Sequence, residues 1–269
     1  LGNMMESSDI SGVHHSPRLA VNHLFGASAY ARFSAGRSFR TPVALEEYAE
    51  YTIRYADDTL VGSGPLYKSE GDLSAEQIDS IEFSFGAEVR NGGYDVKIFQ
   101  EKITDEIDAA KDNGITDILP HWVVQNGGES TIKGAELQLK YTTDSSLFSL
   151  AFAGMRASGW RLKGIDPDLV VEVDDAVPLH TLNGLLSHRF SEGLWAGINY
   201  YSVSEMAFYS GDNTGGYQGL DITLNKQLKM ANTEINLRFV AKNLLGEYFD
   251  FEEETVSSRQ MLLLVQMDF

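Results

Sequence analysis

Polar and apolar residues alternate along most of this chain, and that period of two limits the fold more than any other feature. In TEINLRFVA, Ile235, Leu237 and Phe239 fall on one face of an extended chain, and Glu234 and Arg238 fall on the other. Alternation over six or more residues is typical of a strand with one apolar face. A weak helical pattern occurs in TPVALEEYAEY. The sequence therefore predicts an all-β protein.

The predicted strands are joined by short and long links in turn. We predict eleven strands, at 16–24, 28–38, 77–89, 93–106, 131–142, 146–159, 177–189, 193–208, 217–228, 232–243 and 258–269. The links after the odd-numbered strands are the short segments FGA, RNGG, TDS, SEG and KMA. The links after the even-numbered strands are long, at about 39–76, 107–130, 160–176, 209–216 and 244–257. Long loops at one end and short turns at the other are typical of an antiparallel up-and-down transmembrane β-barrel.

Composition argues against several other classes of protein. The net charge is -18, whereas a nucleic-acid surface needs clustered Lys and Arg. The 269 residues include no cysteine, so the chain has no disulfide and no thiolate metal site. No run of about 18 apolar residues is present, which excludes an ordinary transmembrane helix. No Ser–His spacing suggests a catalytic constellation, so we predict no enzyme activity, no cofactor and no bound metal.

Four motifs, which occur in the family's order, resemble those of TonB-dependent outer-membrane receptors. The segment 16–42 is similar to their hairpin that ends in R-x-F-R-x-P, and 71–85 is similar to their N-P-x-L-x-P-E…E segment. The segment 126–141 is similar to their N…x-G-x-E strand, and 237–251 to their NL-x-x-x-Y element. The matching residues are Arg37, Phe39, Arg40, Pro42, Leu73, Glu76, Glu82, Asn126, Gly134, Glu136, Asn243, Leu244 and Tyr248.

The last residue adds a fifth match. Phe269 ends the alternating segment LVQMDF and resembles the C-terminal aromatic residue that the family presents to the barrel-assembly machinery. In a barrel with this order of links, the last strand ends at the short-turn end, where aromatic side chains form a girdle. We therefore predict that Phe269 serves assembly and not ligand binding.

The resemblance implies a barrel of about 22 strands around an N-terminal plug, which imports a scarce nutrient across the bacterial outer membrane with energy from TonB. Eleven strands leave two open edges, which hydrocarbon does not tolerate, and LGNMMESSDISGVHH lacks the pattern of a signal peptide. We therefore expect residues 1–269 to be the C-terminal part of a receptor barrel. The implied partners are outer-membrane lipid, a plug and barrel half outside this chain, TonB through that plug, and the assembly machinery.

Aromatic and cationic residues in the long links are candidate ligand contacts. They suit a small planar or anionic iron chelate, such as a ferric siderophore, through stacking and charge-assisted hydrogen bonds. The alternative is that Tyr and Trp near strand ends form an interfacial girdle. The candidates are Tyr48, Tyr51, Arg54, Tyr55, Tyr67, His121, Trp122, Trp160 and Arg161, with Tyr209 and Tyr217 beside the fourth long link. Haem receptors of the family have a His between the first two motifs, and its absence between Phe39 and Leu73 disfavours haem.

Alternation also predicts a lumen face, whose polar residues either bond to a plug or form solvated wall. They are Asp95, Lys97, Glu101, Glu136, Gln138, Lys140, Asp221, Asn225, Asn236 and Arg238. A passive porin-like channel is the nearest alternative function, because it shares the barrel and the asymmetry of the loops. A soluble β-rich carbohydrate-binding protein is a more distant alternative.

Overall fold

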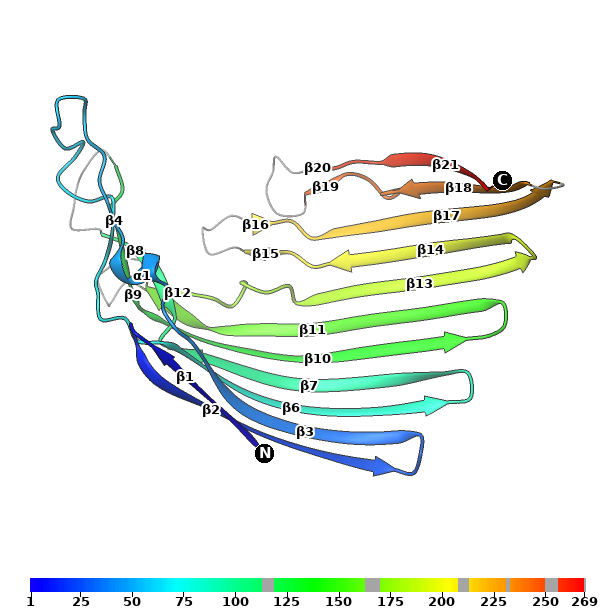
Figure 1. Cartoon of the computed structure of the whole chain (residues 1–269), viewed down its shortest axis with the longest axis horizontal. Helices are drawn as coiled ribbons and strands as arrows, with labels where there is room; N and C mark the ends of the chain where they lie inside the picture. The colour runs from blue at the N-terminus through cyan, green and yellow to red at the C-terminus, as the bar shows by residue number, and fades with distance from the viewer. Residues whose placement is uncertain (113–118, 163–169, 208–212, 231–232, 250–255, 269) are drawn as a thin grey trace.

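One large antiparallel sheet dominates the computed structural model, which describes residues 1–112, 119–162, 170–207, 213–230, 233–249 and 256–268. Figure 1 shows the sheet as a curved wall, with the long connections gathered at one end. Along the wall, the strands are β1 (Gly2–Ser8), β2 (Gly12–Phe25), β3 (Ala29–Arg40), β6 (Glu76–Val89), β7 (Gly92–Thr104), β10 (Gly128–Thr142), β11 (Ser146–Leu162), β13 (His180–Ser191), β14 (Leu194–Val203), β17 (Tyr217–Met230), β18 (Thr233–Lys242) and β21 (Gln260–Asp268). The antiparallel up-and-down wall predicted from the sequence is confirmed.

The first strand, β1, is one that the alternation did not predict. The segment GNMMESS does not alternate, yet it pairs with β2 from Gly2 opposite Arg18 to Ser8 opposite Gly12. The backbone hydrogen bonds of this hairpin, and not an apolar face, define the strand. Its turn, 9–11, is short although it lies at the end with the long connections. The ten links between the eleven predicted strands alternate as expected, and β1 adds a twelfth strand in front of them.

The long connections carry small elements of their own. The predicted helical pattern is confirmed by α1, in which the Glu46 carboxylate accepts a hydrogen bond from the Val43 N–H at 3.0 Å. A three-residue strand, β12, pairs with the last residues of β11. No helix in the described ranges is long and apolar enough to cross a membrane. The elements are α1 (Ala44–Tyr48), β4 (Glu50–Tyr51), β5 (Tyr67–Ser69), β8 (Ile107–Lys111), β9 (Trp122–Asn126), β12 (Val170–Glu172), β15 (Met206–Ala207), β16 (Asn213–Thr214), β19 (Tyr248–Phe249) and β20 (Val256–Ser257).

Strand register divides the wall into a polar and an apolar face. All ten residues predicted for the lumen share one face, where Lys97 lies opposite Glu136 and pairs with its carboxylate at 2.9 Å. On the other face, large apolar side chains are 38% to 69% exposed in this chain. They include Phe33, Phe83, Ile98, Phe152, Leu186, Ile198, Leu224, Phe239 and Leu263. A continuous apolar surface of this extent is unfavourable in water and suits the hydrocarbon of a membrane.

On the polar face, three aromatic rings lie over glycines of the neighbouring strand. Phe99 is opposite Gly134, and the same relation joins Tyr30 to Gly86 and Tyr201 to Gly219. A Cβ atom at Gly134 would lie 2.6 Å from Cζ of Phe99 and 2.9 Å from the carbonyl oxygen of Gly154. Close approach of a neighbouring group is a common reason for glycine inside a strand. The motif glycine Gly134 thus has a packing role.

We expect Gly134→Ala to destabilise the protein by about 1–3 kcal/mol, because overpacking forces the ring or the backbone to move. In a Phe99→Ala background the same substitution should be less harmful, because only the contact with the Gly154 carbonyl remains. Urea unfolding of the full-length protein in lipid vesicles measures both effects in a double-mutant cycle. An equal loss in the two backgrounds would show that the Phe99 ring is not the reason for the glycine.

Candidate functional site

A second, smaller sheet is built by two long connections at the loop end of the wall. Its strand order is β4-β5-β9-β8, so the connection after β3 contributes one half and the connection after β7 the other. The two halves meet in a parallel pair, β5 with β9. Ala110 and Val124 of this sheet are each only 2% exposed, which makes it the most densely buried part of the described chain. We call this four-stranded unit the loop sheet.

Three of the candidate ligand residues lie side by side on the loop sheet. Tyr51 is opposite Tyr67, and Tyr67 is opposite Trp122, whose other neighbour is Lys111. Residues opposite one another in a sheet lie on the same face. Tyr51 is 58% exposed and Trp122 is 39% exposed, whereas Tyr67 between them is half-buried. We call Tyr51, Tyr67 and Trp122 the aromatic row.

The middle member of the aromatic row is held in its neutral form. Burial raises the pKa of Tyr67, and the nearby carboxylates Glu46 and Asp108 raise it further. A tyrosine phenol is already protonated at neutral pH, and this shift keeps Tyr67 protonated to a higher pH, so it can donate a hydrogen bond. The row thus offers flat apolar surfaces, phenolic hydroxyls and the ammonium group of Lys111.

The other candidates of the first two long connections lie outside the row. Tyr48 ends α1 and is 68% exposed, and Tyr55 is 59% exposed in a turn closed by its N–H to the Thr59 carbonyl. Arg54 donates to the carbonyl of Asp58 at 2.9 Å, within the same turn. His121 is 3% exposed, and its Nδ1 donates to the Pro65 carbonyl at 2.6 Å. His121 therefore joins the two halves of the loop sheet and is not placed to reach a ligand.

Motif residues fasten the loop sheet to the wall. Arg40 donates through Nε and Nη2 to the Glu76 carboxylate at 2.6 and 2.7 Å, and through Nη1 to Glu46 at 2.9 Å. Glu76 in turn accepts the N–H of Ile107, the first residue of β8, at 2.8 Å. Four elements, β3, β6, α1 and β8, thus meet at Arg40 and Glu76. We call these two residues the latch.

Two further motif residues hold the base of both connections. The Asn126 side chain accepts the N–H of Ser74 at 2.8 Å and donates to the carbonyls of Ser74 at 3.0 Å and Asp105 at 2.7 Å. Leu73 is 4% exposed, and its N–H donates to the Glu47 carboxylate at 3.0 Å. Two more residues of the first motif lie away from the latch: Pro42 is buried after β3, and the Phe39 ring packs 4.9 Å from that of His14.

The third long connection begins with two candidates that point to different sides. Arg161 pairs with Asp108 of β8 at 3.0 Å, so it positions the loop sheet over the wall. Trp160 lies opposite Glu129 on the apolar face and is 42% exposed, which favours the interfacial girdle over ligand contact. Burial raises the pKa of Glu106 near this pair, and the charges of Glu76 and Asp108 raise it further. The Ser130 hydroxyl donates to Glu106 and opposes the shift.

A tyrosine cluster closes the other part of the loop end. Tyr217 and Tyr248 are stacked with ring centroids 4.5 Å apart, and the Tyr201 hydroxyl lies 3.2 Å from that of Tyr248. Tyr201 also donates to Oδ1 of Asn243 at 2.7 Å. Tyr201 was not among the residues predicted from the sequence. It lies opposite Gly219 of β17, and this pairing becomes visible only when the register of the two strands is known. Tyr209 and Phe269 lie outside the described residues.

Asn243 is the centre of the last motif. It has a φ of 56° and is 8% exposed; its N–H donates to Asp221 at 3.0 Å and its Nδ2 to the Ser258 carbonyl at 3.0 Å. The following residue, Leu244, donates its N–H to the Leu220 carbonyl at 3.0 Å. The NL element therefore ties the connection after β18 back to β17 and to the start of β21. Its role is structural.

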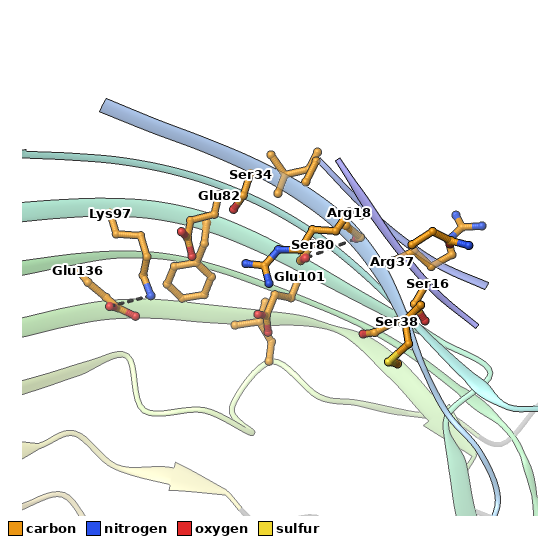
Figure 2. Close-up of a pocket in the computed structure, with 18 of the residues that line it drawn as sticks. Ser16, Arg18, Ser34, Arg37, Ser38, Ser80, Glu82, Lys97, Glu101 and Glu136 are labelled. Atoms are coloured by element: carbon orange, nitrogen blue, oxygen red, sulfur yellow. Dashed lines mark hydrogen bonds and ion pairs between the residues drawn. The ribbon is translucent and has the colours of Figure 1, made fainter. Parts of the chain in front are cut away.

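A cavity of about 840 Å³ opens on the polar face beneath the loop end. Figure 2 shows Glu82, Lys97, Glu101, Glu136 and Arg18 around it, with the ion pair between Lys97 and Glu136 marked. The motif residues Glu82 and Glu136 both line this cavity. Among the described residues, no group of three or more His, Asp or Glu is arranged to hold a metal ion.

A curved antiparallel wall with one apolar face, one polar face and long loops at one end defines a transmembrane β-barrel protein. The family model described as TonB dependent receptor-like, beta-barrel, matches residues 2–244. The chain belongs to this family of TonB-dependent receptor barrels. Known members are outer-membrane receptors and transporters. No curated protein matches the chain.

Solved structures share the fold at low sequence identity. The siderophore receptor PirA from Pseudomonas aeruginosa has a TM-score of 0.67 and 16% identity, over 98% of this chain and 44% of that one. The ferric enterobactin receptor PfeA from the same organism, as the G324V mutant, has a TM-score of 0.65 and 14% identity over 96% and 40%. The FrpB iron transporter from Neisseria meningitidis has a TM-score of 0.65 and 15% identity over 94% and 38%. The chain thus spans about two fifths of these receptors.

Proposed function

We propose that this chain is the C-terminal part of the barrel wall of an outer-membrane receptor that imports a scarce nutrient by TonB-energised transport. The observation that carries the proposal is the family match over residues 2–244, on a wall whose long connections form the loop sheet. The exposed apolar face argues against a soluble carbohydrate-binding protein. A passive porin has no need of a loop sheet latched by Arg40 and Glu76.

The ligand that we propose is an iron chelate of the ferric siderophore type. Its capture site is the aromatic row with Lys111, because aromatic faces and a cation suit a planar, anionic chelate. The names of the similar structures support this class, since they include a siderophore receptor, a ferric enterobactin receptor and an iron transporter. The proposal keeps three of the nine candidate residues, Tyr51, Tyr67 and Trp122, because they lie side by side in one sheet.

The remaining partners follow from the two faces and the two edges of the wall. Lipid covers the apolar face, and a plug segment occupies the cavity of about 840 Å³ on the polar face, where Glu82, Glu101 and Glu136 offer carboxylates to its donors. TonB acts through that plug. Because β1 and β21 end the strand path and hydrocarbon tolerates no open sheet edge, further strands complete the barrel between them. The barrel-assembly machinery recognises Phe269.

Binding measurements on the full-length protein test the capture site. We expect Tyr51→Ala with Trp122→Ala to weaken binding of the ferric chelate by roughly 5–150-fold, because each aromatic stacking contact contributes about 0.5–1.5 kcal/mol. Titration in detergent micelles against a panel of ferric siderophores, ferric enterobactin included, measures the affinity. Uptake by whole cells should fall in parallel.

The matched control keeps the rings and removes the hydroxyls. Tyr51→Phe with Tyr67→Phe should retain most of the affinity if stacking dominates, and both double variants should reach the outer membrane in normal amounts. A wild-type protein that binds none of the ferric chelates would contradict the ligand class. Normal chelate affinity in the Tyr51→Ala, Trp122→Ala variant would contradict the site while leaving the receptor function intact.

A further inference from the structure

The apolar face ends abruptly in a charged band toward the loop end. Across β3, β6, β7 and β10, one row of opposed residues consists of Phe33, Phe83, Ile98 and Ala135. Two residues further along the strands, the row that runs from β6 to β11 consists of Ile81, Gln100, Lys133 and Arg156. On β10 and β11, the change from Ala135 and Gly154 to the charged Lys133 and Arg156 marks the level at which lipid tails give way to headgroups.

Two cations in this band oppose each other directly. Lys133 of β10 lies opposite Arg156 of β11, and both side chains are exposed. Within the described chain neither forms an ion pair, whereas the neighbouring cations Arg37 and Lys102 pair with Asp79 at 2.7 Å and Glu129 at 3.0 Å. Like charges directly opposite in a sheet are destabilising. The pair therefore suits a bound anion, which would remove the repulsion.

The wall is hollowed beside these two cations. The strand β13 begins at His180, opposite Gly154, so β11 continues past Gly154 without β13 beside it. A cavity of about 650 Å³ lies there, lined by Lys133, Arg156, Ser158, Gly154 and Leu179 among others. Asp174 also lines the cavity but forms no ion pair with either cation in the described chain. The hollow is thus lined by two cations together with small and apolar residues.

We propose that Lys133 and Arg156 form a docking site for the phosphate headgroup of an anionic lipid on the outer wall of the barrel. The lipid's acyl chains run down the apolar face beside Phe152, and its phosphate lies between the ammonium and guanidinium groups. Guanidinium and ammonium groups both bind phosphate oxygens through charge-assisted hydrogen bonds. This inference rests on the proposed membrane placement of the apolar face and is independent of the transported ligand.

Lipid binding to the full-length protein tests the proposal. The probe is phosphatidic acid, offered to protein purified in a neutral detergent and detected by native mass spectrometry, with phosphatidylcholine as the zwitterionic comparison. A cation near an anionic membrane surface contributes about fivefold to binding, so Lys133→Gln with Arg156→Gln should weaken phosphatidic acid binding by roughly 30-fold. Lys140→Gln, on the same strand but the polar face, should leave it unchanged.

The stability difference between wild type and the double variant is a second readout, and it should change sign with the lipid. In phosphatidylcholine vesicles the Lys133→Gln, Arg156→Gln variant should unfold at the same urea concentration as wild type or a higher one, because the repulsion is gone. In vesicles that contain phosphatidic acid, wild type should be the more stable protein. Equal phosphatidic acid binding by folded wild type and double variant would overturn the proposal. So would displacement of the bound lipid by inorganic phosphate alone, which would indicate a simple anion site. Failure of all variants to insert would instead count against the membrane placement.

Discussion

Replacement of Asn243 by leucine is expected to destabilise the loop end of the barrel by about 3–4 kcal/mol. Leucine at a φ of 56° is disfavoured by about 1 kcal/mol or more, because its Cβ crowds the backbone in the left-handed region. The substitution also removes one of the two partners of the Tyr201 hydroxyl, which keeps Tyr248, and leaves the Ser258 carbonyl without the Asn243 donor at a site that is 8% exposed. Each unsatisfied buried group costs about 1–3 kcal/mol.

Two milder substitutions separate the backbone effect from the hydrogen bonds. Asn243→Gly tolerates the φ of 56° but loses the side-chain bonds, so it should cost about 2 kcal/mol. Asn243→Asp keeps the acceptor for Tyr201 and loses the donor to Ser258. Urea unfolding in vesicles, with hydrogen exchange of the amides near β19 and β20, measures both. Identical losses for Gly and Leu would show that backbone conformation does not select Asn here.

The second large effect is expected at the latch, where Arg40→Met should destabilise the loop sheet by about 2–3 kcal/mol. The substitution leaves the Glu76 carboxylate, which is 12% exposed, without its cation. Loss of one partner from a buried ion pair costs about 3–5 kcal/mol, and the 41% exposure of Arg40 reduces this. Hydrogen exchange should quicken at the amides of β5, β8 and β9, and chelate capture should weaken with them.

Arg37 provides a matched control on the same strand. It pairs with Asp79 of β6 through Nε and Nη2 at 2.7 and 3.0 Å, in the same bidentate manner as Arg40 with Glu76. The side chains of Arg37 and Asp79 are 45% and 39% exposed, and they lie on the opposite face of the wall from Arg40. Because exposed ion pairs contribute little to stability, Arg37→Met should have little effect. Comparable losses for the two variants would show that burial does not distinguish the latch from a surface pair.

The long connections show where prediction from sequence stopped. In the sequence, nothing distinguishes the four tyrosines of the first long connection as ligand contacts, because they are the same residue type and no local pattern separates them. They are Tyr48, Tyr51, Tyr55 and Tyr67. The pairing of β5 with β9 separates them, because it brings Tyr67 beside Trp122, a residue from another connection. That pairing is parallel and joins segments far apart in the chain, so neither alternation nor turn chemistry predicts it. The burial of His121 has the same cause.

The motif residues were located from sequence, but their roles were not. A pattern such as R-x-F-R-x-P identifies Arg40, and only the structure shows that it bonds Glu76 of the next wall strand and Glu46 of α1. Gly134 is likewise visible in the sequence, whereas the Phe99 ring that excludes a side chain there comes from β7. Each role depends on an atom of another strand.

By itself, the sequence determined the strands and their two faces, because side chains of an extended chain alternate and one face must be apolar in lipid. The lengths of the links determined that neighbouring strands pair in order, because two strands joined by a short turn form an antiparallel hairpin. Only the tertiary structure decided the hairpin partner of β1, the joining of two connections into the loop sheet, and the opposition of Lys133 and Arg156. These depend on register and on contacts between distant segments, which are set by the free energy of the whole fold and leave no period in the local sequence.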